Sequence, residues 1–217
     1  MKIIVTGATG LVGEGVILAC LDHPKVEKIL MVNRRHSHLH HQKLEEYILP
    51  DFLNGDYDLE ILKGYDACFY CAGITSLGMT EEQYTIVTYD TTLVFAQKIK
   101  EANPNIVFNF ISGGLTDSSE KGKMMWARVK GKTENAILRM GFKKSFMLRP
   151  GFIKPYKGQQ NIRSYYKLVT FLMPMLMLFF PNQGGTVEDI AKAMMYISEN
   201  GFDTNILEVP DIKRAAR

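Results

Sequence analysis

A glycine-rich loop near the start of the chain constrains the fold more than any other feature. In KIIVTGATGLVGEGV, Gly7, Gly10 and Gly13 lie between an apolar, β-rich run and a segment with apolar residues at helical spacing. Glycine permits a tight turn, lets phosphates approach the backbone, and lets a helix pack closely on a strand. Free N–H groups at the start of the helix favour anions. The context predicts a dinucleotide-binding loop; the alternative is a structural glycine turn that holds no nucleotide.

Beyond this loop, strand-like and helix-like segments alternate. The expected strands are 2–6, 29–32, 67–71, 106–112, 145–149 and 206–209, and the expected helices are 11–23, 41–49, 81–102 and 121–140. Such alternation implies parallel pairing and an α/β fold with a doubly wound sheet. We expect a single domain, 1–217, in which residues from about 152 onward form a small C-terminal helical lobe. That lobe would lie on the substrate side, over the carboxyl ends of the strands, where ligands bind in such sheets.

The composition is that of a globular protein, with 46% hydrophobic and 23% charged residues among 217. A net charge of +3 is too small to indicate nucleic-acid binding. The first residues do not read as a signal peptide, because a glycine loop follows a very short apolar run. Three cysteines argue against a disulfide framework, and we expect a cytoplasmic protein. Cys68 and Cys71 form a CxxC on an expected strand, where they would point to opposite faces, so buried thiols are expected and no metal site.

The longest apolar run is LVTFLMPMLMLFF, residues 168–180. It is too short to span a bilayer, and Pro174 interrupts it. The run is expected to form a core helix, a homodimer-facing helix or the wall of an apolar substrate pocket. Peripheral membrane contact is a less favoured alternative.

The end of the second expected strand bears on the choice of cofactor. Folds that prefer NAD usually place an acid there to hold the ribose 2′-hydroxyl. This chain instead has Asn33, Arg34 and Arg35. Guanidinium groups suit a 2′-phosphate, so NADP is favoured over NAD, and the alternative is a solvated basic loop. The histidines that follow are expected to add weak positive character and not to bind a metal, since no carboxylate or cysteine is close in sequence: His36, His38, His40 and His41.

Five motifs in order carry a resemblance to a known family. They are TGATGLVG, CAG at 71–73, FIS at 110–112, an aromatic-x-x-x-Lys at 126–130, and RPG at 149–151. With them the chain resembles the atypical short-chain dehydrogenases/reductases, which have an NAD(P)-binding Rossmann fold and are related to the NAD-dependent epimerases/dehydratases. Within that family it is most similar to the subgroup of Tat-interactive-protein-like oxidoreductases.

For the adenosine end of the cofactor, the resemblance implies three groups of residues. The pyrophosphate would be lined by Gly7, Thr9, Gly10, Leu11, Val12 and Gly13. The 2′-phosphate would be held by Arg34 and Arg35, and the adenine would lie beside Asp51 and Phe52. The ribose would pass over Cys71, Ala72 and Gly73.

For the nicotinamide end, the resemblance implies that Lys130 bonds the ribose and that Ser112 orients a substrate carbonyl. The nicotinamide itself would be flanked by Pro150, Gly151, Phe152 and Ile153. The chain departs from the family at Trp126, where a tyrosine normally transfers the proton. An indole N–H donates a hydrogen bond but does not ionise usefully, so Trp126 cannot be the general acid.

Three functions are consistent with this pattern, in order of preference. The first is NADP(H)-dependent reduction or oxidation of a small apolar carbonyl or alcohol. Its proton would come from another source, and the candidates are Tyr84, Tyr89, Ser112, Thr116 and ordered water. The second is NADP(H) binding without turnover, as a redox sensor or scaffold. The third is an epimerase or dehydratase acting on sugar nucleotides.

Overall fold

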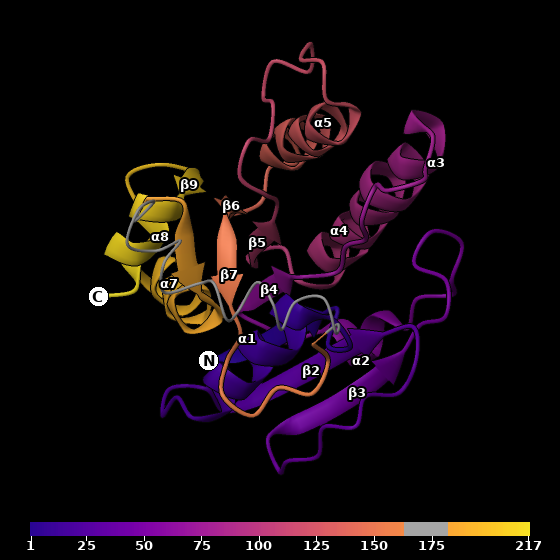
Figure 1. The fold of residues 1–217 in the computed structure, drawn as a ribbon. Coiled ribbons are helices and arrows are strands. Elements are labelled where there is room, and N and C mark those ends of the chain that lie inside the picture. Colours follow the sequence, from indigo (N-terminus) through magenta and orange to yellow (C-terminus); the bar gives the residue numbers. More distant parts are fainter. Residues whose placement is uncertain (163–181) are drawn as a thin grey trace.

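The computed structural model describes residues 1–162 and 182–217. In this part of the chain seven strands form one sheet, and all of its pairings are parallel (Figure 1). In spatial order the strands are β3 (Leu44–Ile48), β2 (Lys28–Asn33), β1 (Lys2–Thr6), β4 (Ala67–Tyr70), β5 (Val107–Ile111), β6 (Lys144–Arg149) and β9 (Ile206–Glu208). The chain first builds outward from β1 to β3 and then returns to build outward from β4. This reversal confirms the predicted α/β, doubly wound parallel sheet.

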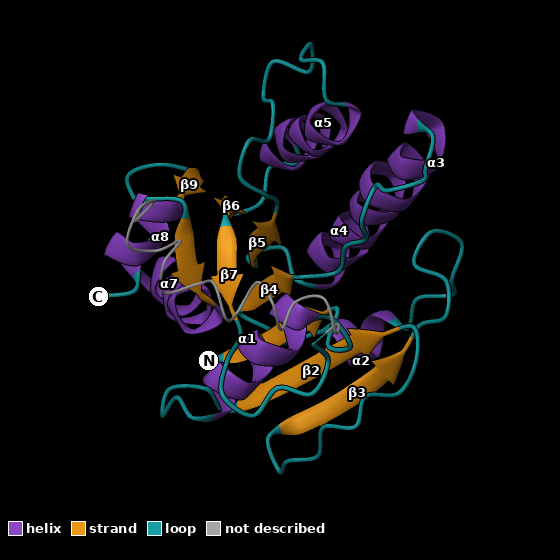
Figure 2. Ribbon diagram, in the orientation of Figure 1, coloured by secondary structure: helices purple, strands orange, loops and turns teal. Residues whose placement is uncertain are grey.

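Helices cover both faces of this sheet (Figure 2). One face carries α1 (Leu11–Leu21), α7 (Val187–Asn200) and α8 (Val209–Ala215), and the other carries α2 (Leu59–Leu62), α4 (Thr91–Ala102) and α5 (Met125–Arg139). Successive residues of a strand point to opposite faces. Ile3 and Val5 therefore join the core on the α1 side, and Ile4 joins the core on the α4 side. Burial on both faces explains why the strands read as nearly continuous apolar runs.

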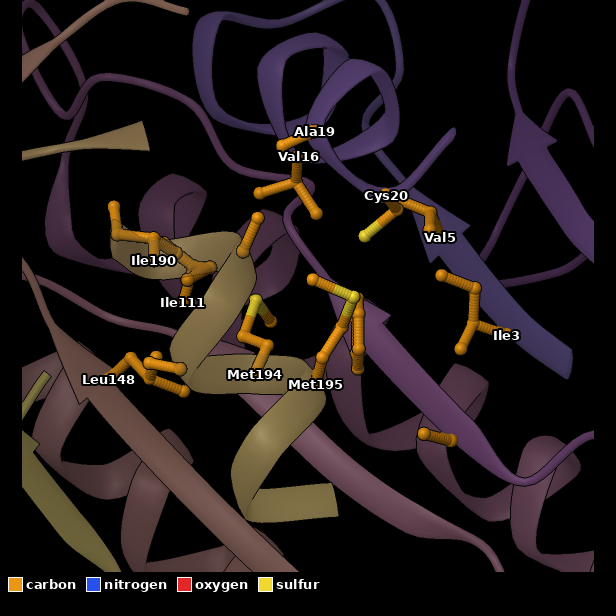
Figure 3. Close-up of a cluster of buried hydrophobic side chains, with 14 of the residues drawn as sticks. Ile3, Val5, Val16, Ala19, Cys20, Ile111, Leu148, Ile190, Met194 and Met195 are labelled. Carbon is orange, nitrogen blue, oxygen red and sulfur yellow. The ribbon is translucent and has the colours of Figure 1, made fainter. Parts of the chain in front are cut away.

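The core between α1 and α7 joins segments that are far apart in sequence. Val16 and Cys20 of α1 meet Ile190 and Met194 of α7 above Leu148 of β6 (Figure 3). All five side chains are buried. This packing places α7 in the same layer as the first helix, so residues 187–217 extend the main layers of the domain.

The C-terminal part accordingly differs from the lobe expected from about residue 152. β9 pairs with β6 in the main sheet, and α7 packs against α1. Only β7 (Phe152–Lys154) and β8 (Gly184–Thr186) form a separate pair, a small two-stranded parallel sheet. The apolar run 168–180 lies outside the described residues. Within the described ranges, no helix is long and apolar enough to cross a membrane.

The expected helix at 41–49 is wrong, because this segment contains strand β3. Its residues Leu44–Ile48 pair in parallel with β2 at the edge of the sheet. The sequence LEEYI carries leucine and two glutamates, which favour a helix locally. Hydrogen bonding to an open sheet edge overrides so weak a preference.

The long helix expected at 81–102 is helical throughout but is not uniform. It consists of α3 (Glu81–Thr85), a π-helical turn η1 (Ile86–Asp90) and α4. A capping box between Thr80 and Gln83 starts it, and it ends before Pro104. π-helical turns are rare and are often found at functional sites.

Candidate cofactor and active site

One large cavity of about 970 Å³ runs along the carboxyl ends of β1, β2, β4 and β5. Of the predicted site residues, those that line it are Gly7, Thr9, Gly10, Leu11, Arg34, Arg35, Asp51, Phe52, Cys71, Ala72, Gly73 and Lys130. The remaining ones lie outside its wall: Val12, Gly13, Ser112, Trp126, Pro150, Gly151, Phe152 and Ile153. Most residues implied for the adenosine end therefore line this cavity. Of the residues implied for the nicotinamide end, only Lys130 does.

The glycine loop is shaped by two close backbone approaches. Gly7 has φ +75°, and a Cβ there would lie 2.8 Å from the backbone of Cys71 and Ala72. A Cβ on Gly13 would overlap the carbonyl oxygen of Gly7, so only glycine lets α1 come this close. Gly10 has no side chain that could cap α1, so the first N–H groups of the helix stay available to an anion.

The arginine pair lies on a loop that is held by buried polar bonds. Asn33 at the end of β2 is buried, and its Oδ1 accepts from the Ala8 N–H at 3.2 Å. Its Nδ2 donates to Glu46 of β3 at 3.1 Å. Arg34 and Arg35 follow at once and are exposed on the cavity wall. Asn33 therefore couples the glycine loop to the arginine loop, and both can face one ligand.

Glu46 organises this loop, and sequence reasoning missed it because it lay on an expected helix. Its oxygens accept from the Ser37 N–H at 2.8 Å, from Asn33, and from His36 at 2.7 Å. Partial burial alone would raise the pKa of Glu46, but these hydrogen bonds outweigh that effect and lower it. The contact between His36 and Glu46 also corrects the expectation that no carboxylate lies near the histidines. No group of three or more potential metal ligands occurs within residues 1–162 and 182–217.

The loop after β3, for which the resemblance implies a place beside the adenine, forms one part of the cavity wall. The Asp51 carboxylate accepts from the backbone N–H groups of Leu53 and Asn54, at 2.8 and 3.0 Å. These bonds, that from Asn54 first, lower the pKa of Asp51. Asp51 is therefore an anion that fixes its own turn, and Phe52 packs inward against Phe95 with ring centroids 5.1 Å apart.

At the opposite end, Lys130 of α5 lies close to the end of β5. Its Nζ donates to the Ser112 carbonyl at 3.2 Å and lies 5.5 Å from the Phe110 ring centroid. Burial lowers the pKa of Lys130 to about 8, although the charge of Glu134 acts in the other direction. The Ser112 hydroxyl is buried and shares a hydrogen bond with Thr116 at 2.9 Å. Lys130 is therefore an amine of the cavity wall whose pKa lies below the ordinary lysine value.

Trp126 lies one helical turn before Lys130 but outside the cavity wall. It is partly buried, and its Cζ3 lies 4.0 Å from the position of a Cβ on Gly113. The indole thus packs towards the loop that follows β5. The spacing read from the sequence holds, but the aromatic ring is not a wall of the cavity.

Of the two tyrosines considered as proton sources, only Tyr84 is part of the described cavity wall. It is buried, burial raises its pKa, and a hydrogen bond with Thr88 partly opposes that rise. Tyr89 lies one turn further on, where Lys132 is 4.4 Å from its ring centroid. Tyr84, Thr88 and Thr92 follow one another at four-residue spacing and all line the cavity, a helical face that the sequence could have indicated.

The RPG motif and the residues after it lie outside the wall of the large cavity. Arg149 forms a two-point ion pair with the buried carboxylate of Glu134, at 3.0 and 2.5 Å, and also contacts Glu208 at 3.1 Å. Phe152 donates its N–H to the Gln183 carbonyl, at the start of the pairing between β7 and β8. Pairing with β8 turns this segment to a second, very small cavity of about 10 Å³, whose lining includes Pro150, Gly151, Phe152 and Ile153.

Sequence reasoning also missed a stretch from the far end of the chain. Gln160, Asn161 and Ile162 line the large cavity beside the glycine loop. They are about 150 residues from that loop and lie in an irregular segment. No local pattern marks such residues, because tertiary packing alone brings them to the site.

Comparisons with known proteins identify the family of this chain. A model of the NAD dependent epimerase/dehydratase family matches residues 3–134, more than half of the 217 residues. "Protein fmp52, mitochondrial" of Emericella nidulans is 27% identical over 159 residues, which are 70% of this chain and 66% of that protein. "Protein FMP52, mitochondrial" of Meyerozyma guilliermondii is 25% identical over 200 residues, 90% and 84% of the two chains. The chain thus spans just under two thirds of the first relative.

Among solved structures, the Bordetella bronchiseptica enzyme WbmF in complex with NADH is similar in fold. It has a TM-score of 0.68 at 13% identity, over 99% of this chain and 74% of that chain. The Helicobacter pylori ADP-L-glycero-D-manno-heptose-6-epimerase has a TM-score of 0.65 at 19% identity, over 91% and 73%. Identities this low carry the fold alone, and they agree with the Rossmann topology described above.

The relatives also correct one expectation. The sequence was taken to indicate a cytoplasmic protein, but the curated relatives are named as mitochondrial, which contradicts that assignment. The physical reason is that the cysteine count argues only against a disulfide framework and does not distinguish one compartment from another. The family is shown more directly, by the family model and by the glycine loop that the fold places at its predicted position. The chain belongs to the NAD dependent epimerase/dehydratase family.

Proposed function

We propose that this protein is an NADP(H)-dependent oxidoreductase acting on a small apolar carbonyl or alcohol. The observation that carries the proposal is the single cavity whose wall joins the glycine loop, both arginines and Lys130. A volume of about 970 Å³ is at the upper end of the range for cofactor and ligand pockets, so a dinucleotide fits. A Cβ on Gly7 would meet the backbone of Cys71, so the cradle depends on glycine at this position.

The adenosine end supports NADP(H) over NAD(H). The cavity wall at the end of β2 presents Arg34 and Arg35, and the nearby Glu46 has its oxygens occupied by other donors. Two exposed guanidinium groups provide charge-assisted bonds to a 2′-phosphate. A ribose with a free 2′-hydroxyl would gain little from them.

The nicotinamide cofactor supplies the hydride chemistry when it is bound. The chain's own contribution at that end is to bind and orient the ligands and to move a proton. Lys130 presents a cationic donor, and Ile74, Ile86 and Val87 give the cavity apolar surface suited to an apolar substrate. Tyr84 takes the place of the missing family tyrosine as proton source, since Tyr84 belongs to the cavity wall and Trp126 does not.

A specific observation also favours NADP(H) binding without turnover. Trp126 occupies the position of the proton-transferring tyrosine, and an indole cannot replace a phenol as an acid. In this case the same cavity binds the cofactor as a redox sensor or scaffold. The epimerase or dehydratase alternative has the family membership as its support.

One titration separates these functions. Purified protein is titrated with NADPH and with NADH while cofactor fluorescence is followed, and then NADPH oxidation is measured with aldehydes, ketones and quinones. Sugar nucleotides are incubated with protein and cofactor, and their products are analysed. Preferential NADPH binding with carbonyl turnover is the expected result. Binding without any turnover would favour the sensor, sugar conversion would favour the epimerase, and no cofactor binding would overturn the proposal.

A further inference from the structure

A buried polar atom in the cavity wall has no partner of its own. The side-chain nitrogen of Asn161, Nδ2, is shielded from solvent and makes no hydrogen bond with any residue of 1–162 or 182–217. Asn161 nevertheless lines the large cavity together with the glycine loop. A buried N–H donor without an acceptor costs about 1–3 kcal/mol, so such a group needs an explanation. A ligand in the cavity would supply the acceptor.

The backbone on either side of this side chain is fixed by a buried carboxylate. Glu14 lies in the first turn of α1 and is fully buried. Its Oε1 accepts from the Gln160 N–H at 2.8 Å, and its Oε2 accepts from the Asn161 N–H at 2.7 Å. One carboxylate thus positions two consecutive peptide groups, which fixes the backbone of Asn161 beside the cavity.

Further bonds fasten the same stretch to α1. Gln159 donates from Nε2 to the Leu11 carbonyl at 2.6 Å, and a Cβ on Gly15 would overlap the Gln159 side chain. Tyr156 donates its hydroxyl to Asp22 at 2.8 Å. We call residues 156–162 the strap. The strap therefore runs along α1 from its C-cap at Asp22 to its first turn. Its residues 159–161 bond to Leu11 and Glu14, at the end of the helix that follows the glycine loop.

The charge of Glu14 does not prevent an anion from binding nearby. Its two oxygens accept from the strap, and His38 of the arginine loop lies 3.3 Å from Oε1. The first turn of a helix also stabilises negative charge. Glu14 thus links the strap to the loop that carries Arg34 and Arg35. Both oxygens of its carboxylate already have partners in these two segments.

We propose that Asn161 is a binding residue for the cofactor diphosphate, and that Glu14 is the positioning residue that holds it there. The Asn161 Nδ2 donates to a diphosphate oxygen beside the glycine loop. The strap, residues 156–162, lies over the phosphates. It completes a site whose other lining residues are all among the first 130. This inference rests on the proposed function and assigns a further residue to its site.

The test measures the affinities of Asn161→Ala for NADPH, NADH and adenosine 2′-monophosphate by calorimetry. Both dinucleotides contain a diphosphate, whereas adenosine 2′-monophosphate contains only the 2′-phosphate. A hydrogen bond to a charged acceptor corresponds to a loss of about 10- to 100-fold. We expect NADPH and NADH to lose the same factor and adenosine 2′-monophosphate to bind as before. Asn161→Asp, which places an anion beside the diphosphate, should bind both dinucleotides still more weakly.

Two variants complete the test. Asn182→Ala makes the same substitution at an exposed asparagine outside the cavity wall and should bind all three ligands normally. Glu14→Gln keeps the shape but accepts fewer bonds, and it should weaken dinucleotide binding by less when Asn161 is already alanine. Thermal melts check that each variant is folded.

The outcomes distinguish this inference from the proposed function. If the wild type binds NADPH and Asn161→Ala binds it equally well, Asn161 is not a ligand residue, and the proposed function stands. An equal loss for adenosine 2′-monophosphate would also overturn the inference, because the effect would then act at the adenosine end. If the wild type binds no dinucleotide, both proposals fail.

Discussion

The two ends of the cavity differ in how fully they match the family pattern. At the adenosine end, the glycine loop, the arginine pair, Asp51–Phe52 and Cys71–Gly73 all contribute to one wall. At the nicotinamide end, Lys130 is in place, but Trp126 replaces the acid, and Pro150–Ile153 line a different, small cavity. In the proposed function, cofactor binding rests on backbone geometry and charge, whereas proton transfer rests on a side chain other than the one at the family position. Substitutions can therefore test the two separately.

The largest expected effect concerns the RPG motif, which we assign to stability at the nicotinamide end. Glu134→Ala leaves the buried guanidinium of Arg149 without its main partner and should reduce the free energy of unfolding by about 3–5 kcal/mol. Denaturant titration measures this loss. The control is Glu208→Ala, because that carboxylate is half exposed, and removal of an exposed partner should cost about 1 kcal/mol or less. Equal losses of unfolding free energy in the two variants would show that the buried pair of Arg149 and Glu134 is no more stabilising than the exposed pair with Glu208.

The next prediction concerns the proton source. Tyr84→Phe removes only the hydroxyl and should lower kcat by about 100-fold or more, with NADPH affinity little changed. Tyr89→Phe is the matched control one turn further along the helix and should retain the wild-type kcat. A wild-type kcat in Tyr84→Phe would leave Ser112, Thr116 or water as the candidate proton source. If Trp126→Phe has the wild-type kcat, the indole takes no part in the chemistry.

At the adenosine end, the double substitution Arg34→Ala with Arg35→Ala should weaken NADPH binding by about 100-fold. NADH binding should change by about threefold or less, because NADH lacks the 2′-phosphate that the arginines hold. Calorimetry with both cofactors on the same variant provides the internal control. Parallel losses for NADPH and NADH would show that the arginine pair does not read the phosphate.

The smallest effect is a titration at Lys130. Its pKa is lowered from 10.5 to about 8 by burial, so the folded protein holds fewer protons at this site than the unfolded chain between pH 8 and 10.5. This group alone should therefore make the protein more stable as pH rises through that window. Reductive ¹³C-methylation followed by NMR should show one lysine signal titrating near pH 8, absent in Lys130→Arg. A signal that titrates only near 10.5 would show that Lys130 is solvated.

Much of the fold follows from local patterns. The glycine loop and the apolar strands were predicted correctly, because tight turns and burial on both faces restrict which residues occur there. The helix expected at 41–49 failed for the opposite reason, since its residues suit a helix and only the open edge of β2 made it a strand. Glu46 was overlooked with it, although it holds Asn33 and the loop that carries the arginines.

The sequence by itself determined most of the order of strands and helices, with β3 as an exception, together with the glycine loop and the departure at Trp126. These depend on sterics and chemistry within a few residues. Only the tertiary structure decided that Tyr84 and not Tyr89 lines the cavity, that Arg149 pairs with Glu134, and that Glu14 holds the Asn161 backbone 147 residues away. Such contacts depend on how whole layers pack. The residues adjacent in sequence do not indicate which distant segment will pack against a given residue.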